Sequence, residues 1–416
     1  MRKTLVVAGG GAAGFFCAVT AARLNPQLKV ILVEKTGKLL SKVKVSGGGR
    51  CNVTHACFSI PDMVRKYPRG AQFVKKTFHQ FFTRDTIQWF EERKLHLKTE
   101  EDGRMFPQSN SSQSVIDCLL QEANQYQVEI RLHHEIKNID YVTKSNSFTL
   151  QFGNELKLNA DFICLACGGY PKYSMFEWIL QSGHTIEEPV PSLFTFNMPG
   201  HSINTLMGVS VPDAQVKIAG ESLKERGPLL ITHWGMSGPA ILKLSAWGAR
   251  LLKEKEYRFE IRVNWLGDRS DQSVRDEMLM TRESSGGKKI RQKNSFGLPQ
   301  RLWEWLLEQA GIKDIHWADL PAALQNKLIQ LITNQSFPVE GKTTFKEEFV
   351  TAGGIRLSEI NHHTMESRIR PGLYFAGELL DVDAVTGGFN FQHAWTSGFI
   401  AGKSIAEKSF ELTVDG

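Results

Sequence analysis

Residues 4–34 read TLVVAGGGAAGFFCAVTAARLNPQLKVILVE, and this stretch decides the fold. Thr4–Ala8 is a short apolar run typical of a buried parallel strand. Phe15–Leu24 has the pattern of a helix, and Val30–Val33 is a second apolar strand. Together the three segments predict a strand–helix–strand unit close to its minimum length.

Three glycines between the first strand and the helix follow a nucleotide-binding spacing. Gly9, Gly11 and Gly14 fit Gly-x-Gly-x-x-Gly: the first allows a tight turn, the second lets backbone approach a pyrophosphate, and the third lets the helix pack against the strand. The helix N-terminus, at Ala12 and Ala13, offers N–H groups to phosphates. Glu34 follows about 20 residues after the last glycine, where an acid can accept from ribose hydroxyls. The pattern predicts a site for the ADP half of a dinucleotide.

The end of the chain favours FAD over NAD as that dinucleotide. Leu373–Ala376 is predicted to be a short buried strand, and it is followed by Gly377 and Glu378. We expect Glu378 near the ribitol or pyrophosphate, because an extended cofactor needs contacts beyond the ADP site.

A second helix, from about Asn390 to Ala406, is expected after Gly387 and Gly388. The N–H groups of Phe389, Asn390 and Phe391 would then lie near the polar edge of the flavin and stabilise negative charge on its reduced form. No second Gly-x-Gly-x-x-Gly occurs. A dedicated NADPH domain is therefore not expected, although NAD(P)H could still dock transiently as a reductant.

Several distinctive blocks are spread over nearly the whole chain: residues 9–14, 46–54 (SGGGRCNVT), 232–239 (THWGMSGP), 351–355 (TAGGI), 364–367 (TMES), 372–383 (GLYFAGELLDVD) and 386–392 (TGGFNFQ). Together these blocks resemble the BaiN/RdsA-type flavoproteins, also called aminoacetone-oxidase-like or YhiN-like FAD-binding proteins. Two places depart from the family: YPKYSMFE after Gly169 replaces a glycine-rich run, and Ala384 stands where glycine is common.

The resemblance implies an α/β fold with a Rossmann-like FAD-binding domain built from both chain ends, at 1–190 and 346–416. It also implies an inserted middle domain at 191–345, with a β-barrel-like part and a small helical part. It places Lys42, Arg50, Cys51 and Asn52 against the cofactor, and Ile136 with Ala166–Gly168 beside the adenosine. The full set expected to bind FAD non-covalently is Gly9, Gly11, Ala12, Ala13, Gly14, Glu34, Lys35, Lys42, Gly48, Arg50, Cys51, Asn52, Ile136, Ala166, Cys167, Gly168, Gly377, Glu378, Gly388, Phe389, Asn390 and Phe391.

Other segments carry weaker local expectations. Gly37–Thr54 reads as a loop, and both Phe73–Lys94 and Ser114–Gln125 read as helices. The strands expected in an antiparallel meander are Val128–Leu132, Ile136–Tyr141, Phe148–Phe152 and Leu156–Leu158, with Phe162–Ala166 as a further buried strand. In the middle domain we expect helices at Pro299–Gln309 and Pro321–Thr333, and the least ordered segment at Arg282–Arg301.

Composition limits the class of protein. The chain has 416 residues, 41% hydrophobic and 23% charged, as in ordinary globular proteins. Six cysteines do not make a disulfide scaffold in a chain this long, and no apolar run is long enough to span a bilayer. Arg2 and Lys3 before an apolar stretch superficially resemble a signal peptide, but the glycine spacing favours the nucleotide-binding interpretation, and we expect a cytoplasmic protein.

The cysteines and histidines give less specific signals. Cys164 and Cys167 are expected to be packing residues, because strand residues three apart point to opposite faces. Cys51 and Cys57 have five residues between them, against four in flavin disulfide reductases. The pairs His133-His134 and His362-His363 lack partners at metal-ligand spacing, so no metal is implied. His233 is either a proton donor or a histidine that orders its turn.

Two basic stretches could contact RNA phosphates or could be solvated surface: Arg65, Lys66, Arg69, Lys75, Lys76 and Arg84, and the segment Arg282–Arg301. The resemblance implies an FAD-dependent oxidoreductase, with reduction of a conjugated carbon–carbon double bond as the leading reaction, in uridine of ribosomal RNA or in an unsaturated small molecule. An amine oxidase and a non-catalytic flavin- or RNA-binding protein remain open. The sequence does not indicate the oligomeric state.

Overall fold

The computed structural model describes residues 2–153, 155–343 and 350–414, and the chain divides into two compact units. Unit 1 comprises Met1–Pro191 and Lys346–Gly416, so it contains both ends of the chain. Unit 2 comprises Ser192–Phe345. Each unit has its own sheets and its own buried core.

The central sheet of unit 1 is parallel, with the strand order β20-β10-β1-β2-β6. Its strands are β1 (Thr4–Ala8), β2 (Lys29–Val33), β6 (Glu129–Arg131), β10 (Phe162–Leu165) and β20 (Leu373–Phe375). The expected strands of the nucleotide-binding unit are confirmed. The assignment of Val128–Leu132 to an antiparallel meander is wrong, because β6 pairs in parallel with β2 and forms the sheet edge. The meander itself is β7 (Ile136–Val142), β8 (Ser147–Phe152) and β9 (Lys157–Ala160).

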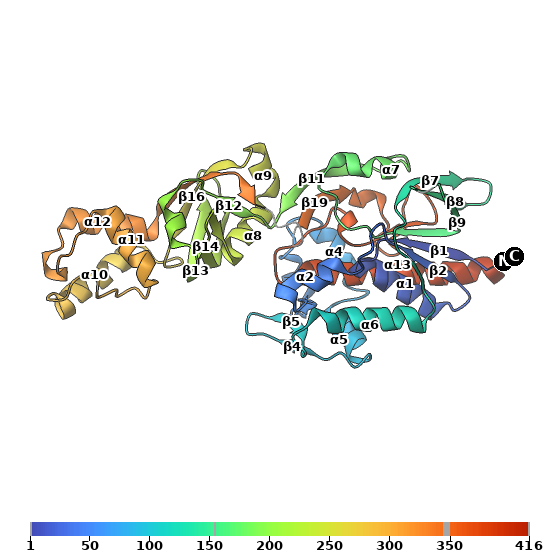
Figure 1. Ribbon diagram of the computed structural model, residues 1–416, viewed down its shortest axis with the longest axis horizontal. Helices are drawn as coiled ribbons and strands as arrows, with labels where there is room; N and C mark the ends of the chain where they lie inside the picture. Colours follow the sequence, from blue (N-terminus) through green and yellow to red (C-terminus); the bar gives the residue numbers. More distant parts are fainter. Residues whose placement is uncertain (1, 154, 344–349, 415–416) are drawn as a thin grey trace. The chain divides into compact units, whose positions relative to one another are not determined.

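Two helices from opposite ends of the chain pack side by side, α1 (Ala12–Leu24) and α13 (Phe389–Val414) (Figure 1). Glycines on α13 allow the contact: a Cβ at Gly398 would lie 2.4 Å from the Ala13 carbonyl oxygen, and one at Gly402 would lie 2.4 Å from that of Cys17. The C-terminal segment therefore belongs structurally to the first βαβ unit.

The remaining elements of unit 1 surround this core. They are α2 (Ser41–Gly49), β3 (Thr54–His55), α3 (Ile60–Val64), α4 (Ala71–Thr77), α5 (Thr83–Glu91), β4 (Leu97–Thr99), β5 (Arg104–Pro107), α6 (Ser112–Gln125), η1 (Tyr173–Phe176), α7 (Glu177–Leu180), β11 (Ile186–Ser192), β19 (Val350–Ile355), η4 (Leu357–Glu359) and η5 (Gly377–Leu379).

Two local expectations for unit 1 are wrong. Gly37–Thr54 is not a continuous loop, since it contains α2, which kinks where Gly47 and Gly48 take φ values of 58° and 69°. Phe73–Lys94 is not one helix. The chain is extended at Phe82, whose N–H donates to the Asp85 carboxylate at 2.7 Å, and this side-chain cap starts α5 as a separate helix.

Unit 2 contains a seven-stranded antiparallel sheet with the order β17-β16-β13-β14-β15-β12-β18. The strands are β12 (Thr195–Asn197), β13 (Ser210–Ile218), β14 (Lys224–Ile231), β15 (Gly235–Ser237), β16 (Arg258–Asn264), β17 (Gln335–Glu340) and β18 (Lys342–Thr343). The helices are α8 (Pro239–Trp247), α9 (Ala249–Glu254), α10 (Asp271–Ser285), α11 (Gln300–Ala310) and α12 (Ala322–Thr333). The two helices expected in this region are confirmed.

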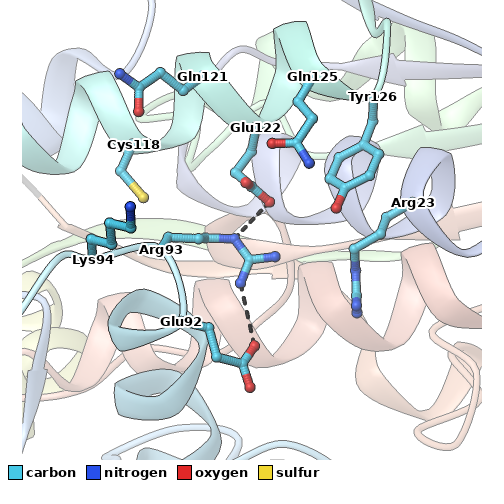
Figure 2. Close-up of a pocket in the computed structure, with 9 residues that line it drawn as sticks. All are labelled: Arg23, Glu92, Arg93, Lys94, Cys118, Gln121, Glu122, Gln125 and Tyr126. Carbon is cyan, nitrogen blue, oxygen red and sulfur yellow. Dashed lines mark ion pairs between the residues drawn. The ribbon is translucent and has the colours of Figure 1, made fainter.

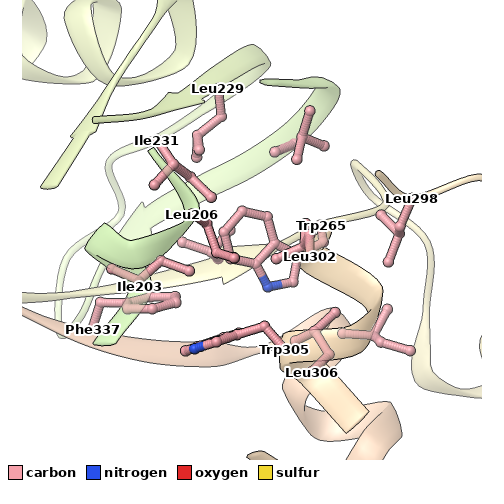
Figure 3. Close-up of a cluster of buried hydrophobic side chains, with 14 of the residues drawn as sticks. Ile203, Leu206, Leu229, Ile231, Trp265, Leu298, Leu302, Trp305, Leu306 and Phe337 are labelled. Carbon is pink, nitrogen blue, oxygen red and sulfur yellow. The ribbon is translucent and has the colours of Figure 1, made fainter. Parts of the chain in front are cut away.

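The core of unit 2 joins its sheet to its helical part (Figure 3). Phe337 of β17 meets Trp305 of α11 at 6.4 Å between ring centroids and Trp265 at 5.9 Å. The segment Arg282–Arg301, predicted to be the least ordered of this region, contains a buried residue. Ile290 is fully buried and its carbonyl accepts from the Trp303 indole at 3.1 Å, so the loop is fixed by the core.

In the part of the chain that the structure describes, no helix is both long enough and apolar enough to cross a membrane.

Candidate functional site

The carboxyl ends of three neighbouring strands of unit 1 meet at one edge of the sheet. The Ala166 N–H, after β10, donates to the Ala8 carbonyl at 2.8 Å, and the Ala376 N–H, after β20, donates to the Leu165 carbonyl at 3.0 Å. Strand order reverses between β1 and β10, since the chain runs from β1 to β2 on one side and from β10 to β20 on the other. Ligands of open α/β sheets bind at such a reversal.

The glycines of the fingerprint divide into two kinds. A Cβ at Gly9 would lie 2.3 Å from the Ala166 carbonyl oxygen, and one at Gly14 would lie 1.9 Å from that of Gly9. Gly9 also has φ +113°. A Cβ at Gly11 would have no atom within 4 Å, and Gly11 has an ordinary φ of −97°. The fold itself requires Gly9 and Gly14, whereas Gly11 faces open space at the N-terminus of α1.

The Glu34 carboxylate is held against this glycine turn. Its Oε2 accepts from the Gly10 N–H at 2.9 Å, and its Oε1 accepts from the Thr36 N–H and hydroxyl, each at 2.9 Å. A carboxylate has about four acceptor sites, so capacity remains for a ribose hydroxyl.

The residues expected beside the adenosine are grouped near Glu34. The His134 N–H donates to the Glu34 carbonyl at 2.9 Å, which brings in the strand start at Ile136, a buried residue. The Cys167 thiol contacts the Ala8 carbonyl at 3.4 Å, and Gly168 has φ +76° with open space beyond its Cα.

Lys35 lies beside Tyr170, in the segment that follows β10. The Lys35 ammonium lies 5.7 Å from the centre of the Tyr170 ring, and Tyr170 is buried. A cation and an aromatic ring therefore stand next to the residues expected beside the adenosine.

A second group of expected residues forms where the segment after α2 packs on the start of α13. With its amide turned to satisfy both neighbours, Asn52 accepts from the Gly388 N–H at 2.9 Å. The Thr54 hydroxyl donates to the Gln392 side chain at 2.6 Å, and the His55 ring nitrogen lies 3.1 Å from the Gly387 carbonyl oxygen. The first N–H groups of α13, at Phe389, Asn390 and Phe391, have no partner within the helix and suit a polar ligand edge.

An ion pair links the expected residues of α2 and η5. Lys42 Nζ lies 2.5 Å from Glu378 Oε2, and Glu378 Oε1 accepts from the Thr351 N–H at 2.9 Å. Gly377, with φ +73°, approaches α1 so closely that a Cβ there would lie 2.8 Å from that of Ala13. The fold thus brings together the predicted residues of α1, α2 and η5.

Arg50 and Cys51 lie between these groups with their side chains engaged. Arg50 pairs with Glu100 at 2.5 Å and stacks on Phe106, 4.0 Å from the ring centre. Cys51 is fully buried in a left-handed conformation, and burial raises the pKa of its thiol to about 12. Cys51 is therefore a protonated thiol at neutral pH, and neighbouring Gly48 leaves open space.

Sequence reasoning missed a set of contacts that fix the start of α13. Asp383 is fully buried and pairs with Arg69 through two hydrogen bonds. The Tyr67 hydroxyl donates to the Phe389 carbonyl at 2.6 Å, and the Asn390 amide bonds both the N–H and the carbonyl of Ala384 at 2.9 Å. Arg69 and Asp383 are 314 residues apart, so no local pattern reveals them.

His233 lies in unit 2, in the turn between β14 and β15, where its side chain is exposed. Thr232 closes this turn without it, since its N–H and hydroxyl reach the Gly235 carbonyl at 2.8 and 3.1 Å. The His233 ring packs on Trp234, with 4.3 Å between ring centroids.

All six cysteines are free thiols. Among the described residues, no group of three or more His, Cys, Asp or Glu side chains is placed to hold a metal ion.

A separate pocket lies at the opposite end of α1, far along the helix from the glycine turn (Figure 2). Arg93 pairs there with Glu122 at 2.6 Å and with Glu92 at 3.6 Å. Arg23 lies in the last turn of α1, and Lys94 follows the end of α5. Cations at these positions offset the negative ends of the two helix dipoles. These charges have a structural explanation, and we assign the pocket no ligand.

The site residues fit FAD: open space at Gly11, spare acceptor capacity at Glu34 and two helix N-termini in one unit. This fold and site define the chain as an FAD-dependent oxidoreductase. It belongs to the HI0933-like protein family, whose Rossmann-domain model matches residues 3–404. The resemblance found in the sequence and the expected fold class are confirmed.

Curated relatives match over nearly their full length. A 3-dehydro-bile acid delta(4,6)-reductase of Clostridium scindens is 27% identical over 97% of this chain and 98% of its own length. A ribosomal RNA dihydrouridine synthase of Escherichia coli is 28% identical over 98% of this chain and 99% of its own.

Solved structures support the fold. The 3-ketosteroid-delta4-(5alpha)-dehydrogenase of Rhodococcus jostii has a TM-score of 0.53 at 12% identity, with 97% of each chain covered. A flavocytochrome c3 fumarate reductase has a TM-score of 0.50 at 15% identity, covering 98% of this chain and 79% of its own.

Proposed function

We propose that this protein uses FAD to reduce a carbon–carbon double bond conjugated to a carbonyl group, and that uridine in ribosomal RNA is its substrate. The observation that supports this proposal best is the full-length match to two reductases whose names denote the same chemistry. Dihydrouridine formation saturates the uracil double bond next to a carbonyl, and a delta(4,6)-reductase saturates double bonds of a 3-oxo steroid skeleton. The shared step adds a hydride to one carbon and a proton to the other.

We propose the following roles for the chain. Reduced FAD, bound at the carboxyl ends of the unit 1 strands, would supply the hydride and would itself be reoxidised. The α1 N-terminus and Gly11 hold the pyrophosphate, Glu34 accepts from a ribose hydroxyl, and the α13 N-terminus faces the flavin edge. Unit 1 acts as the FAD domain and unit 2 as the substrate domain. Free cysteines suit a reducing compartment, and we place the protein in the cytoplasm.

His233 is the proposed proton donor. It makes no hydrogen bond with a described residue, and Thr232 already closes the turn, so the histidine is not needed to order it. We expect His233→Gln to lower the rate of product formation while leaving flavin reduction by NAD(P)H unchanged. Equal loss of both rates, or of neither, would refute this role.

The first experiment is a spectrum of the purified protein, followed by identification of the heat-released cofactor. The reduced holoprotein is then mixed without oxygen with ribosomal RNA from an E. coli strain that lacks its dihydrouridine synthase. Reoxidation of the flavin with stoichiometric dihydrouridine supports the proposal. Rapid flavin reduction by an amine with peroxide release supports an amine oxidase instead, and RNA binding without redox cycling supports a non-catalytic protein.

NADPH and NADH are the proposed electron donors, docking transiently because the sequence has no second dinucleotide fingerprint. Each is tested by the rate at which it bleaches the flavin's visible absorbance. If neither bleaches the flavin, another reductant is required.

A further inference from the structure

Four side chains able to carry positive charge gather on unit 1 from two segments far apart in the sequence. Lys76 lies on α4, and His362, His363 and Arg368 lie between η4 and β20. The segments touch: the Gln80 amide donates to the His362 carbonyl at 3.2 Å, and the His362 ring meets Phe73 of α4 at 6.5 Å between ring centroids. The fold, rather than a local sequence run, creates this cluster.

The cluster has no balancing acid among the described residues. No ion pair joins Lys76, His363 or Arg368 to a described carboxylate, and all three side chains are exposed. Burial lowers the pKa of His362, and His363, Lys76 and Arg368 lower it further by charge repulsion. Like charges held together without a counterion cost free energy.

The acids of the same segment face elsewhere. Glu359 accepts from the Thr185 N–H at 2.8 Å. Glu366 accepts from the Gly372 N–H at 2.6 Å and pairs with Lys408 at 2.5 Å. The positive field of the cluster is therefore left for a partner in solution.

The first basic stretch of the sequence contributes to this surface only in part. Arg69 is committed to the buried Asp383, and the Arg84 guanidinium lies 4.9 Å above the exposed Phe58 ring. Lys76 differs from both, since no ion pair joins it to a described carboxylate and it lies close enough to His362 to lower the pKa of that histidine.

We propose that Lys76, His362, His363 and Arg368 form a surface that binds the phosphate backbone of RNA. Arginine can take a phosphate through two parallel hydrogen bonds, lysine acts as a point charge, and protonated imidazoles donate. The inference rests on the proposed function, which it deepens by selecting RNA over an unsaturated small molecule. Charge complementarity and the full-length match to the ribosomal RNA dihydrouridine synthase of Escherichia coli favour RNA over another polyanion.

The test measures RNA binding by the oxidised holoprotein, with no reductant present. Labelled ribosomal RNA from the E. coli deletion strain is titrated by fluorescence anisotropy over a series of salt concentrations. Each phosphate contact on single-stranded RNA contributes about 0.7 to the slope of log K against log salt. The double variant Lys76→Gln/Arg368→Gln should reduce the slope by about 1.4 and weaken binding roughly tenfold near 0.1 M salt.

The matched control is Lys144→Gln/Lys157→Gln, which removes two exposed charges from the β7–β9 sheet of the same unit. The control should bind RNA like the wild type, and both variants should keep their flavin spectrum and melting temperature. Equal losses in the two variants would mean diffuse attraction, and no loss in the first variant would mean that the cluster does not touch RNA. Either result overturns the proposal.

The histidines provide a second measurement. A phosphate favours protonated imidazole, and the pKa of His362 lies below its ordinary value, so RNA affinity should rise mainly as pH falls below about 6.5. The double variant His362→Gln/His363→Gln should remove most of this rise in affinity. An unchanged pH dependence would show that the two histidines do not contact RNA phosphates. Failure of RNA binding while a small enone is still reduced would refute this surface and leave the reductase chemistry intact. Binding with the expected slope but no dihydrouridine would do the reverse.

Discussion

The substitution Gly11→Ala tests whether Gly11 is required for cofactor binding, in contrast to Gly9 and Gly14, which are required for folding. The new methyl group meets no protein atom within 4 Å, and the backbone at Gly11 is already in an ordinary conformation. The variant should therefore fold. The same methyl group would project into the space assigned to the pyrophosphate, and overpacking of this kind costs about 1–3 kcal/mol. The FAD dissociation constant should rise roughly 5- to 150-fold.

The assay is titration of the apoprotein with FAD, followed by flavin fluorescence, together with thermal unfolding of the apoprotein. Gly287→Ala is the matched control, because a Cβ there also meets no atom within 4 Å and Gly287 lies in unit 2. Gly14→Ala, by contrast, should prevent folding, since its Cβ would lie 1.9 Å from the Gly9 carbonyl oxygen. An unchanged FAD affinity in Gly11→Ala would refute the placement of the cofactor.

Three further outcomes are expected. Glu34→Gln should raise the FAD dissociation constant about tenfold, because the amide keeps the shape of the side chain but loses a charge-assisted acceptor. Equilibrium titration of the apoprotein with FAD measures this constant, and an affinity equal to that of the wild type would exclude a contact between Glu34 and the ribose. Asp383→Asn should lower the free energy of unfolding in urea by about 3–5 kcal/mol, because it removes one charge from a buried ion pair. Asp268→Asn, at an exposed ion pair, should cost less than about 1 kcal/mol. Burial lowers the pKa of His184 and His393 to about 4. Histidines in the unfolded chain take up protons near pH 6.5, so the free energy of unfolding should fall between about pH 6.5 and pH 4. The fall should be at most about 1.4 kcal/mol per pH unit for each histidine. His393→Gln should make that decline shallower in thermal melts, and an identical decline would show that His393 is already accessible to protons.

The signals that predict the nucleotide-binding half of the site are local, and the structure brings the residues that carry them together. Gly9, Gly11, Gly14 and Glu34 fall within one βαβ unit, where strand, turn and helix geometry determine the spacing of each residue. The structure adds that Gly11 differs physically from its neighbours, which the spacing alone does not indicate.

The local predictions miss features where the conformation of the backbone depends on a side chain several residues away or in another segment. The hydrophobic period across Phe73–Lys94 predicts one helix, but Asp85 caps a new one at Phe82. The charges and glycines of Arg282–Arg301 predict the least ordered segment of the middle domain, and they do not indicate that Ile290 is buried with its carbonyl bonded to the Trp303 indole. Composition measures average polarity, whereas one buried residue is enough to fix a loop.

The flavin half of the site depends on contacts that no single-sequence pattern contains. Tyr67, Arg69 and Asn52 hold the turn that starts α13, and their partners lie more than 300 residues later in the chain. The start of α13 also depends on α1, because Gly398 of α13 packs on Ala13 of α1. We propose that α1 presents the pyrophosphate end of the site and α13 the flavin end, and the packing of these two helices would then set the separation between the two N-termini. The insertion of unit 2 leaves that packing within unit 1. The residues proposed to bind FAD therefore all belong to unit 1, and their arrangement does not depend on the inserted unit.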